Sequence, residues 1–517
     1  MTDLGRLGSG NAPRARLACP RFAGARSERH SRLGRRPRPG DKQLLVVTLL
    51  LALVLPASAL AQGDSRGKVW PDPRPWRKDV PQSAWARIQL RADLQNLFHF
   101  KNDGDFDRTE PAYDASGQSV GAFATIFTPR VTLHILESLR IYYEVELGLN
   151  FWSEQNPDQQ DPVADDIFVL KHREIYGEGE LADGRVGFKV GYAFFGDPTR
   201  LFLAHWIGVA QTWWQLRDGT PLLHPGAPHR GARTGVRLGL FVGQVPDQIH
   251  EGILLDDNNF KRDIWVFGGR YDLSVSELWR LSAAVTALYD THLVDQTRWL
   301  LCPSLHLELA FGRLDAFADL AFQGGQQRGQ AAGGGDQTHL AWAAQAGLRL
   351  GLGRLDLRGT LLALSPDDAH PGNERNHAFL YSGKSRSATL MLTEDEVRDW
   401  YDNLDERASS NSGGFFASRA GLMVGDLEVT LKLHERVRPA VVVGAATVLK
   451  PHNALDGILV GVEVDGVLHL LLADYLVADL VVGAMVPGAA GAALINSIDR
   501  SSTDPIVMTE ISLTLRY

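Results

Sequence analysis

The chain contains 517 residues, of which 44% are hydrophobic and 22% are charged, and its formal net charge is −8. Without residues 1–61, interpreted below as an extension and an export signal, 42 basic and 58 acidic residues remain, a net charge near −16. This acidity argues against a nucleic acid as partner. Cys302 is then the only cysteine left, which excludes an intrachain disulfide and a cysteine-based zinc site.

The N-terminal region divides into three segments ahead of the first predicted strand. Residues 1–40 form an Arg-rich extension with too little apolar content to fold. It is either a nucleic-acid or targeting arm or, the interpretation we favour, an over-long gene start. Residues 41–61 have the order of a signal peptide, with Lys42, an apolar run at 44–55 and a small-residue end at Ala61. The run is too short to span a bilayer, so we expect cleavage after Ala61 and a short periplasmic segment at 62–83.

From residue 84 onwards the chain follows the two-residue period of β-strands. Segments 86–95 and 139–151 alternate apolar with polar or charged residues. In a soluble sandwich the apolar face would be the core, whereas in a membrane barrel it faces lipid. The number and length of the runs favour the barrel, because a tilted spanning strand needs about ten residues. Seventeen further runs of this kind lie at 120–135, 165–180, 185–195, 206–217, 233–243, 262–273, 279–290, 299–311, 313–323, 338–350, 353–363, 414–424, 426–435, 438–449, 456–472, 475–486 and 505–517.

The connections between these runs alternate in length, as they do in outer-membrane barrels. Single-chain bacterial barrels have an even number of strands, so one of the nineteen runs is expected to be spurious or split. We therefore predict an all-β fold, a transmembrane antiparallel up-and-down β-barrel of about 18 strands (16–18) over residues 84–517. Short connections are expected at 137–138, 312, 351–353 and 425–426, and long polar ones at 101–119, 153–164, 218–232, 244–261, 324–337 and 364–413.

Two segments depart from the simple strand pattern. The stretch 466–486 is apolar enough to suggest a spanning helix, but His469, Asp474 and Asp479 would then lie in lipid, so a hairpin near Asp474 is predicted instead. The segment 393–403 has a capping box at Thr393 and Glu396 and helical spacing after it. One short helix is therefore predicted there, inside the longest loop.

Motifs that would indicate an enzyme or a metal centre are weak. The pattern at 117–121 matches a nucleophile elbow, but a Gly/Ser turn is the favoured interpretation because no helix follows it. The acidic stretch 102–107 lacks the remainder of a calcium loop. His224 and His229 lie in a proline-containing loop without a zinc-binding motif. We predict no metal, no cofactor and no catalytic residues.

Charged residues on strand faces opposite the apolar ones are the candidate functional residues. Facing lipid would cost about 2 to 4 kcal/mol for each basic side chain near the midplane, so these charges are expected to face the interior. They either hydrate a wide lumen or form a constriction that selects by charge. The pore-lining candidates, with two from the loop after 185–195, are Arg140, Glu144, Glu146, Lys171, Arg173, Lys189, Asp197, Arg200, Arg237, Glu463 and Asp465.

The last residues of the chain alternate strictly and end on an aromatic side chain. Ile511, Leu513, Leu515 and Tyr517 resemble the terminal strand of bacterial outer-membrane barrels, which the barrel-assembly machinery recognises. The resemblance implies that these four residues are an assembly signal and that outer-membrane lipid and this machinery are partners.

A second resemblance concerns the segments 185–192, 195–201 and Trp206. Together they are similar to the strand-and-loop signature of the alginate-export family of outer-membrane porins, and the segment 461–465 with Pro487 and Gly488 is similar to that family's penultimate hairpin. Tyr192 stands where the family tends to place Arg. The resemblance implies an 18-stranded barrel whose loop at 197–200 folds toward the pore.

The predicted function is passive passage of hydrophilic molecules through the outer membrane, with anionic sugars or a polysaccharide as the expected cargo. Two alternatives stay open: a barrel-scaffolded enzyme of the lipase type, and a structural or adhesive barrel plugged by its loops. Single-channel conductance would separate the first function from both alternatives.

Overall fold

The computed structural model describes the strands and part of their connections. The described residues are 87–101, 120–136, 138–150, 168–181, 185–217, 235–245, 264–275, 278–291, 297–328, 336–367, 375–382, 386–392, 416–417, 420–450, 457–495 and 505–516. The predicted N-terminal extension, signal peptide and segment 62–83 lie outside them, as do the predicted helix 393–403 and Tyr517.

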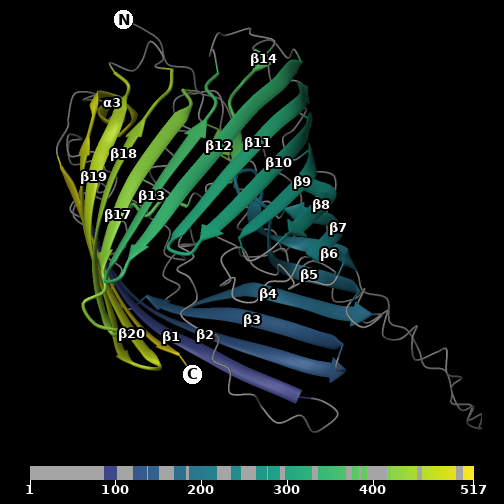
Figure 1. The fold of residues 1–517 in the computed structure, drawn as a ribbon, viewed down its shortest axis with the longest axis horizontal. Coiled ribbons are helices and arrows are strands. Elements are labelled where there is room, and N and C mark those ends of the chain that lie inside the picture. Colours follow the sequence, from purple (N-terminus) through teal and green to yellow (C-terminus); the bar gives the residue numbers. More distant parts are fainter. Residues whose placement is uncertain are drawn as a thin grey trace, which may run out of the picture. The chain divides into compact units, whose positions relative to one another are not determined.

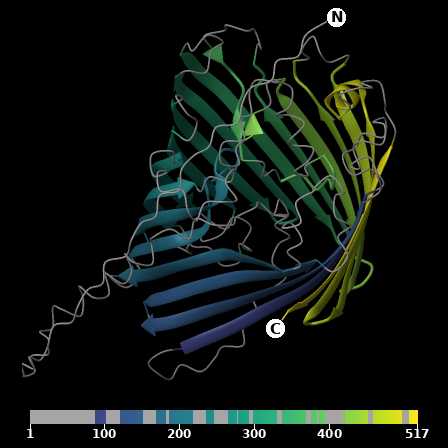
Figure 2. The ribbon, with the colours of Figure 1, turned by 180° about the vertical axis from the view of Figure 1, so that it is seen from behind.

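Eighteen long strands form one closed antiparallel barrel, with each strand paired to its neighbour in sequence (Figure 1). The ring closes where β1 pairs with β21, in a register that sets Asp93 opposite Arg516 (Figure 2). The predicted fold and strand number are thereby confirmed. The strands are β1 (Arg87–Lys101), β2 (Val120–Leu136), β3 (Leu139–Asn150), β4 (Phe168–Leu181), β5 (Val186–Gly196), β6 (Ala204–Arg217), β7 (Gly235–Val245), β8 (Ile264–Ser274), β9 (Trp279–Asp290), β10 (Thr297–Phe311), β11 (Leu314–Arg328), β12 (Gln337–Leu352), β13 (Leu355–Leu364), β17 (Leu422–Leu431), β18 (Val437–Thr447), β19 (Leu459–Ala473), β20 (Leu476–Pro487) and β21 (Ile506–Arg516).

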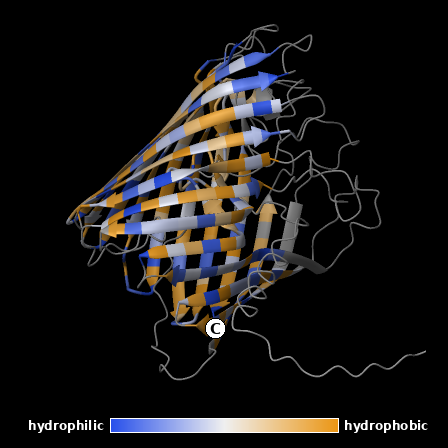
Figure 3. Cartoon of the chain, turned by 90° about the vertical axis from the view of Figure 1, so that its right-hand side faces the viewer, coloured by the Kyte–Doolittle hydropathy of each residue, from blue (hydrophilic) through white to orange (hydrophobic). Residues whose placement is uncertain are grey.

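Hydrophobic and hydrophilic residues alternate along many of the strands (Figure 3). Because successive side chains of a strand point to opposite faces, this alternation gives the barrel an outer apolar and an inner polar face. On β10, Trp299, Leu301 and Leu305 are exposed on the outside, whereas Ser304 and His306 are buried on the inside. The terminal strand follows the same rule, since Ile511, Leu513 and Leu515 are exposed. None of the helices among the described residues is long and apolar enough to cross a bilayer.

The predicted hairpin within 466–486 is confirmed, because β19 and β20 pair through a turn at 474–475. Two of the nineteen predicted runs, 414–424 and 426–435, are wrong as separate strands. They correspond to the single strand β17, and Gly425 and Asp426, predicted as a turn, lie in its middle. The seven-residue helix α3 (Ala489–Ile495) after β20 was not predicted.

Tight turns join the strands at one end of the barrel. Gly312 and Gly353 have φ values of 67° and 68°, a left-handed conformation that favours glycine, in the turns after β10 and β12. The connections at the other end are longer, as predicted. The connection 218–234 between β6 and β7 is an exception, because strand order places this long segment at the end of the short turns.

The connection between β13 and β17 contributes to the interior of the barrel. It contains three two-residue strands: β14 (Arg375–Asn376) pairs with β12 in parallel, and β15 (Leu380–Tyr381) pairs with β16 (Phe416–Ala417). We call its described residues 375–382 and 386–392 the inner insert. Phe379 and Met391 of the insert are fully buried in one apolar cluster with inward-facing residues such as Leu300 and Val424.

Candidate functional site: the inner insert and the loop after β5

The loop 197–203, between β5 and β6, is organised by one carboxylate. Asp197 Oδ1 accepts hydrogen bonds from Thr199 N (2.8 Å), Thr199 Oγ1 (2.6 Å) and Arg200 N (2.6 Å). Its Oδ2 accepts from Phe202 N (3.2 Å) and Leu203 N (3.0 Å). Burial raises the pKa of Asp197, and these donors act in the opposite direction. Asp197 therefore fixes the conformation of the loop 197–203 by binding its backbone, and its own side chain is buried.

The loop 197–203 is joined directly to the inner insert. Ser382 donates its backbone N–H to Leu201 O (2.9 Å) and its hydroxyl to Arg200 O. Arg200 has a φ of 60°, in the left-handed region that residues other than glycine rarely adopt. On the insert's other side, Gln323 of β11 accepts from Leu380 N (2.9 Å) and donates to Leu380 O (2.8 Å). The insert is thus fixed between the loop and the barrel wall.

A second carboxylate, far from Asp197 in the sequence, binds the other end of the insert. Glu463 of β19 accepts from three consecutive backbone amides, Leu390 (2.7 Å), Met391 (2.6 Å) and Leu392 (2.7 Å). Asp465 also accepts from Leu390 N, at 3.0 Å. Successive N–H groups that converge in this way form an anion-binding concavity. Glu463 and Asp465, predicted to line the pore, are buried under the insert and bind its backbone.

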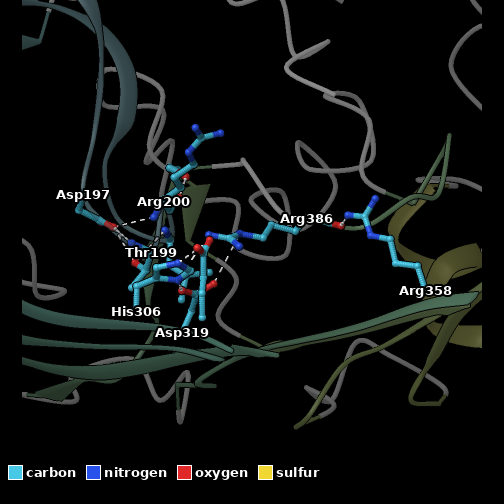
Figure 4. A network of polar contacts seen from close by, with 10 residues as sticks. Asp197, Thr199, Arg200, His306, Asp319, Arg358 and Arg386 are labelled. Carbon is cyan, nitrogen blue, oxygen red and sulfur yellow. Dashed lines mark hydrogen bonds and ion pairs between the residues drawn. The ribbon is translucent and has the colours of Figure 1, made fainter. Parts of the chain in front are cut away.

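Arginine side chains gather around the insert (Figure 4). Arg358 of β13 donates to the Arg386 carbonyl at 2.6 Å, and the Arg386 guanidinium lies 3.7 Å from Asp319 and over the ring of Phe317. Asp319 also contacts His306 at 2.5 Å. Asp319 is therefore already paired with both His306 and Arg386.

Arg200 is placed differently from Arg386. No described carboxylate lies within ion-pair distance of its guanidinium, which lies over the Phe194 ring at 5.8 Å from its centre. Burial lowers the pKa of Arg200 to about 10, and the positive charges of Arg386 and Arg270 add to this effect, while Asp197 opposes it. A cationic group with like-charged neighbours attracts an anion when it is accessible.

The remaining predicted residues lie on consecutive strands from β3 to β7 and are mostly paired. Strand pairing places β3 to β7 side by side. The contacts are Arg140 with Glu178, Glu144 with Arg130 (2.9 Å), Glu146 with Arg173 (2.8 Å), the Lys189 ammonium over the Tyr176 ring (3.7 Å) and Arg237 over the Trp213 ring (5.4 Å). Lys171 lies in β4 opposite Glu146, and its side chain is outside the described set.

Sequence reasoning missed the residues that hold the insert. Arg386 lies in the predicted loop 364–413, and Gln323, Ser382 and His306 carried no motif. The signal available for Gln323 and His306 was their inward position on alternating strands. Ser119, the serine of the possible nucleophile elbow, lies outside the described residues. The described residues contain no group of His, Cys, Asp and Glu side chains that could hold a metal ion.

Comparisons with known proteins agree with the fold. No family model matches the chain, and no curated protein matches its sequence. Among solved structures, a BenF-like porin from Pseudomonas fluorescens Pf-5 is 12% identical, with 83% of this chain and 98% of that chain covered and a TM-score of 0.50. Pseudomonas aeruginosa OccK11 (OpdR) is 13% identical (83% and 95% covered, TM-score 0.47), and Acinetobacter baumannii OccAB2 is 9% identical (83% and 98%, 0.49).

The class that the fold defines is that of the transmembrane β-barrel, and the likeness to the BenF-like porin is a likeness of fold. The resemblance to the alginate-export family stays a prediction.

Proposed function

We propose that the protein is a passive channel of the outer membrane for small hydrophilic anions. The observation that carries this proposal is the charge around the insert. Arg270 and Arg386 are paired with Asp272 and Asp319, whereas the Arg200 guanidinium has no described carboxylate within ion-pair distance and lies near both of these positive charges. Asp197 and Glu463 are occupied by backbone amides. At Arg200, positive charge is therefore less compensated than negative charge where the insert and loop 197–203 narrow the lumen, which favours anions even in an acidic protein.

Planar-bilayer recording of the purified protein tests this proposal. We expect discrete conductance steps. Across a salt gradient, we expect a reversal potential whose sign shows a preference for anions. Arg200→Gln should weaken that preference, whereas Arg436→Gln, the same charge change in the turn between β17 and β18, should leave it unchanged. A cation preference in the parent protein, or the absence of conductance steps, would contradict the proposal.

The size of the cargo is the finer question, because the family resemblance implies a polyuronate chain. The position of the insert favours a small cargo, because it occupies part of the lumen and leaves less room for a polysaccharide chain. Conductance in the presence of uronate monomers and of longer oligouronates decides between them. Block that strengthens steeply with chain length would favour a polysaccharide, and equal weak block would favour a small anionic sugar.

We also propose that β21 with Tyr517 is the signal for assembly into the outer membrane. The outward positions of Ile511, Leu513 and Leu515 support this, because they continue the apolar exterior to the end of the chain. Deletion of Tyr517 should reduce the amount of heat-modifiable protein in outer-membrane fractions without changing the conductance of the molecules that assemble. Normal amounts of the deleted form would contradict this role.

A further inference from the structure

The two sides of the barrel interior differ in exposure. Inward side chains under the insert are sealed: Asp319 and Glu463 are 0% exposed and Gln323 is 1% exposed. On the wall formed by β1 to β3, the side chains of Arg130 and Asp93 keep contact with solvent, at 33% and 24% exposed. The interior is therefore filled unevenly.

The anchors of the insert explain this difference. The insert is bonded to Gln323 on β11, Arg358 on β13 and Glu463 on β19, and to the loop 197–203 through Ser382. None of these contacts reaches β1, β2, β3 or β4. The inner face of those strands is left uncovered by the described insert.

The exposed wall carries a continuous set of paired charges. Arg130 of β2 donates to Asp93 of β1 at 2.8 Å and to Glu144 of β3 at 2.9 Å. Tyr142 donates its hydroxyl to Glu144 and stacks on Tyr176 of β4, with ring centres 5.0 Å apart. Polar groups that are paired and yet partly solvated can line water without the cost of buried, unmatched charge.

We propose that the aqueous route through the barrel is off-centre and follows this wall of β1 to β3, so that Arg130 and its partners are the groups that a passing solute meets. The inference rests on the proposed channel function, and it assigns the wall opposite the insert as a second determinant of charge selectivity. Arg130 compensates two carboxylates, so its loss leaves Asp93 and Glu144 uncompensated beside the route.

Thiol accessibility tests the route with a matched pair of small substitutions. Thr132 lies on β2 on the face opposite Leu133 and pairs with Tyr142, and Ser304 lies inward on β10, where it is 6% exposed. In a Cys302→Ser background, T132C and S304C are treated with a membrane-impermeant anionic methanethiosulfonate. We expect T132C to react on the order of tenfold faster or more, because thiol reactivity follows exposure. The parent Cys302, which is buried, should stay unlabelled.

Conductance is recorded on the same samples, after heat-modifiable migration confirms that each variant is folded. Labelled T132C should lose part of its single-channel conductance, and R130Q should shift the reversal potential toward cations. Equal labelling of both cysteines, faster labelling of S304C, or labelled T132C with unchanged conductance would each overturn the route. If the parent protein shows no conductance steps while the T132C variant is still labelled, the channel function is overturned and the hydrated wall remains.

Discussion

Asp197 and Glu463 have the same structural role in two regions of the molecule. Each is a buried carboxylate whose oxygens accept backbone N–H groups and thereby hold a segment inside the barrel. The bonds of Asp197 go to residues two to six positions further on, whereas those of Glu463 reach 71 to 73 positions back. The first builds a turn within one loop, and the second ties a distant segment to the wall.

The difference shows how the interior is stabilised. A local carboxylate turn can form as soon as its own loop is ordered, because little chain entropy is lost. The Glu463 contact requires both β19 and the insert to be in place. Ser382 joins the two systems through Arg200 O and Leu201 O. Substitutions at these positions should therefore differ in size and in how far their effects extend.

The largest effect is expected from Glu463→Ala. Met391 N and Leu392 N lose their acceptor and Leu390 N keeps only Asp465, at about 1–3 kcal/mol for each buried donor that stays unsatisfied. The insert should loosen, so the unfolding midpoint in denaturant falls and single-channel conductance becomes larger and noisier. Glu510→Ala is the control, an acidic residue of β21 that no described bond joins to the insert. Unchanged conductance with Glu463→Ala would show that the insert is held without this carboxylate.

A smaller effect is expected from Asp197→Asn, because the amide keeps one acceptor oxygen. The bonds from Phe202 N and Leu203 N lose their acceptor, again at about 1–3 kcal/mol each. Limited proteolysis should reveal easier cleavage in 197–203, with the insert still protected. Cleavage of the insert at the same rate as the loop would mean that the two segments unfold as one unit.

Ser382→Ala should cost less still, about 0.5–1.5 kcal/mol, because the backbone bond from Ser382 N to Leu201 O remains. Its value lies in a double-mutant cycle with Asp197→Asn. We expect a coupling energy between the two positions, measured from denaturant midpoints, since both act through Arg200. Strict additivity would argue that the loop and the insert are independent.

The smallest structural effect is expected from deprotonation of Arg200, which changes charge without removing a loop anchor. Burial lowers the pKa of Arg200 to about 10, so the guanidinium is protonated below about pH 10 and neutral above it. Anion preference, measured from reversal potentials, should fall as the pH is raised through about 10. Arg200→Gln should lack this component of the pH profile, and an identical profile in both proteins would rule Arg200 out.

The same lowered pKa sets the sign of the effect on stability. The unfolded chain keeps its proton up to the higher, ordinary pKa of arginine, so the folded state binds fewer protons from about pH 10 up to that ordinary value. The Arg200 contribution to the free energy of unfolding therefore rises with pH within this window and is constant below it.

The fold was predictable because a membrane barrel repeats one simple rule. Alternation with runs of about ten residues identified the strands, and the even strand number followed from closure. The pattern failed at 414–424, because an apolar residue buried in the lumen has the same signature as one facing lipid. Residues 416–417 pair with the insert, and the true strand begins at Leu422. Gly425 and Asp426 are typical turn residues, yet Asp426 faces inward and accepts from Thr360.

The site was predictable only in part. Alternation placed Glu463 and Asp465 on the inner face, but their partners are backbone amides, which every residue carries and no motif marks. The wall residues Arg140, Glu144 and Glu146 were identified as interior charges, and their ion pairs depend on strand register, which the sequence leaves open. The position of Arg386 could not be predicted, because a loop has no regular period from which the direction of its side chains could be inferred.

The anchors of the insert also have a mechanical consequence. Each long strand of the ring pairs with its two neighbours in the barrel, and these pairings alone do not tie together strands that lie further apart. The insert joins β11, β13 and β19, which are not all adjacent, through hydrogen bonds inside the ring. Flattening would have to stretch these bonds. The insert therefore acts as a transverse brace that keeps the cross-section constant under lateral pressure from the bilayer.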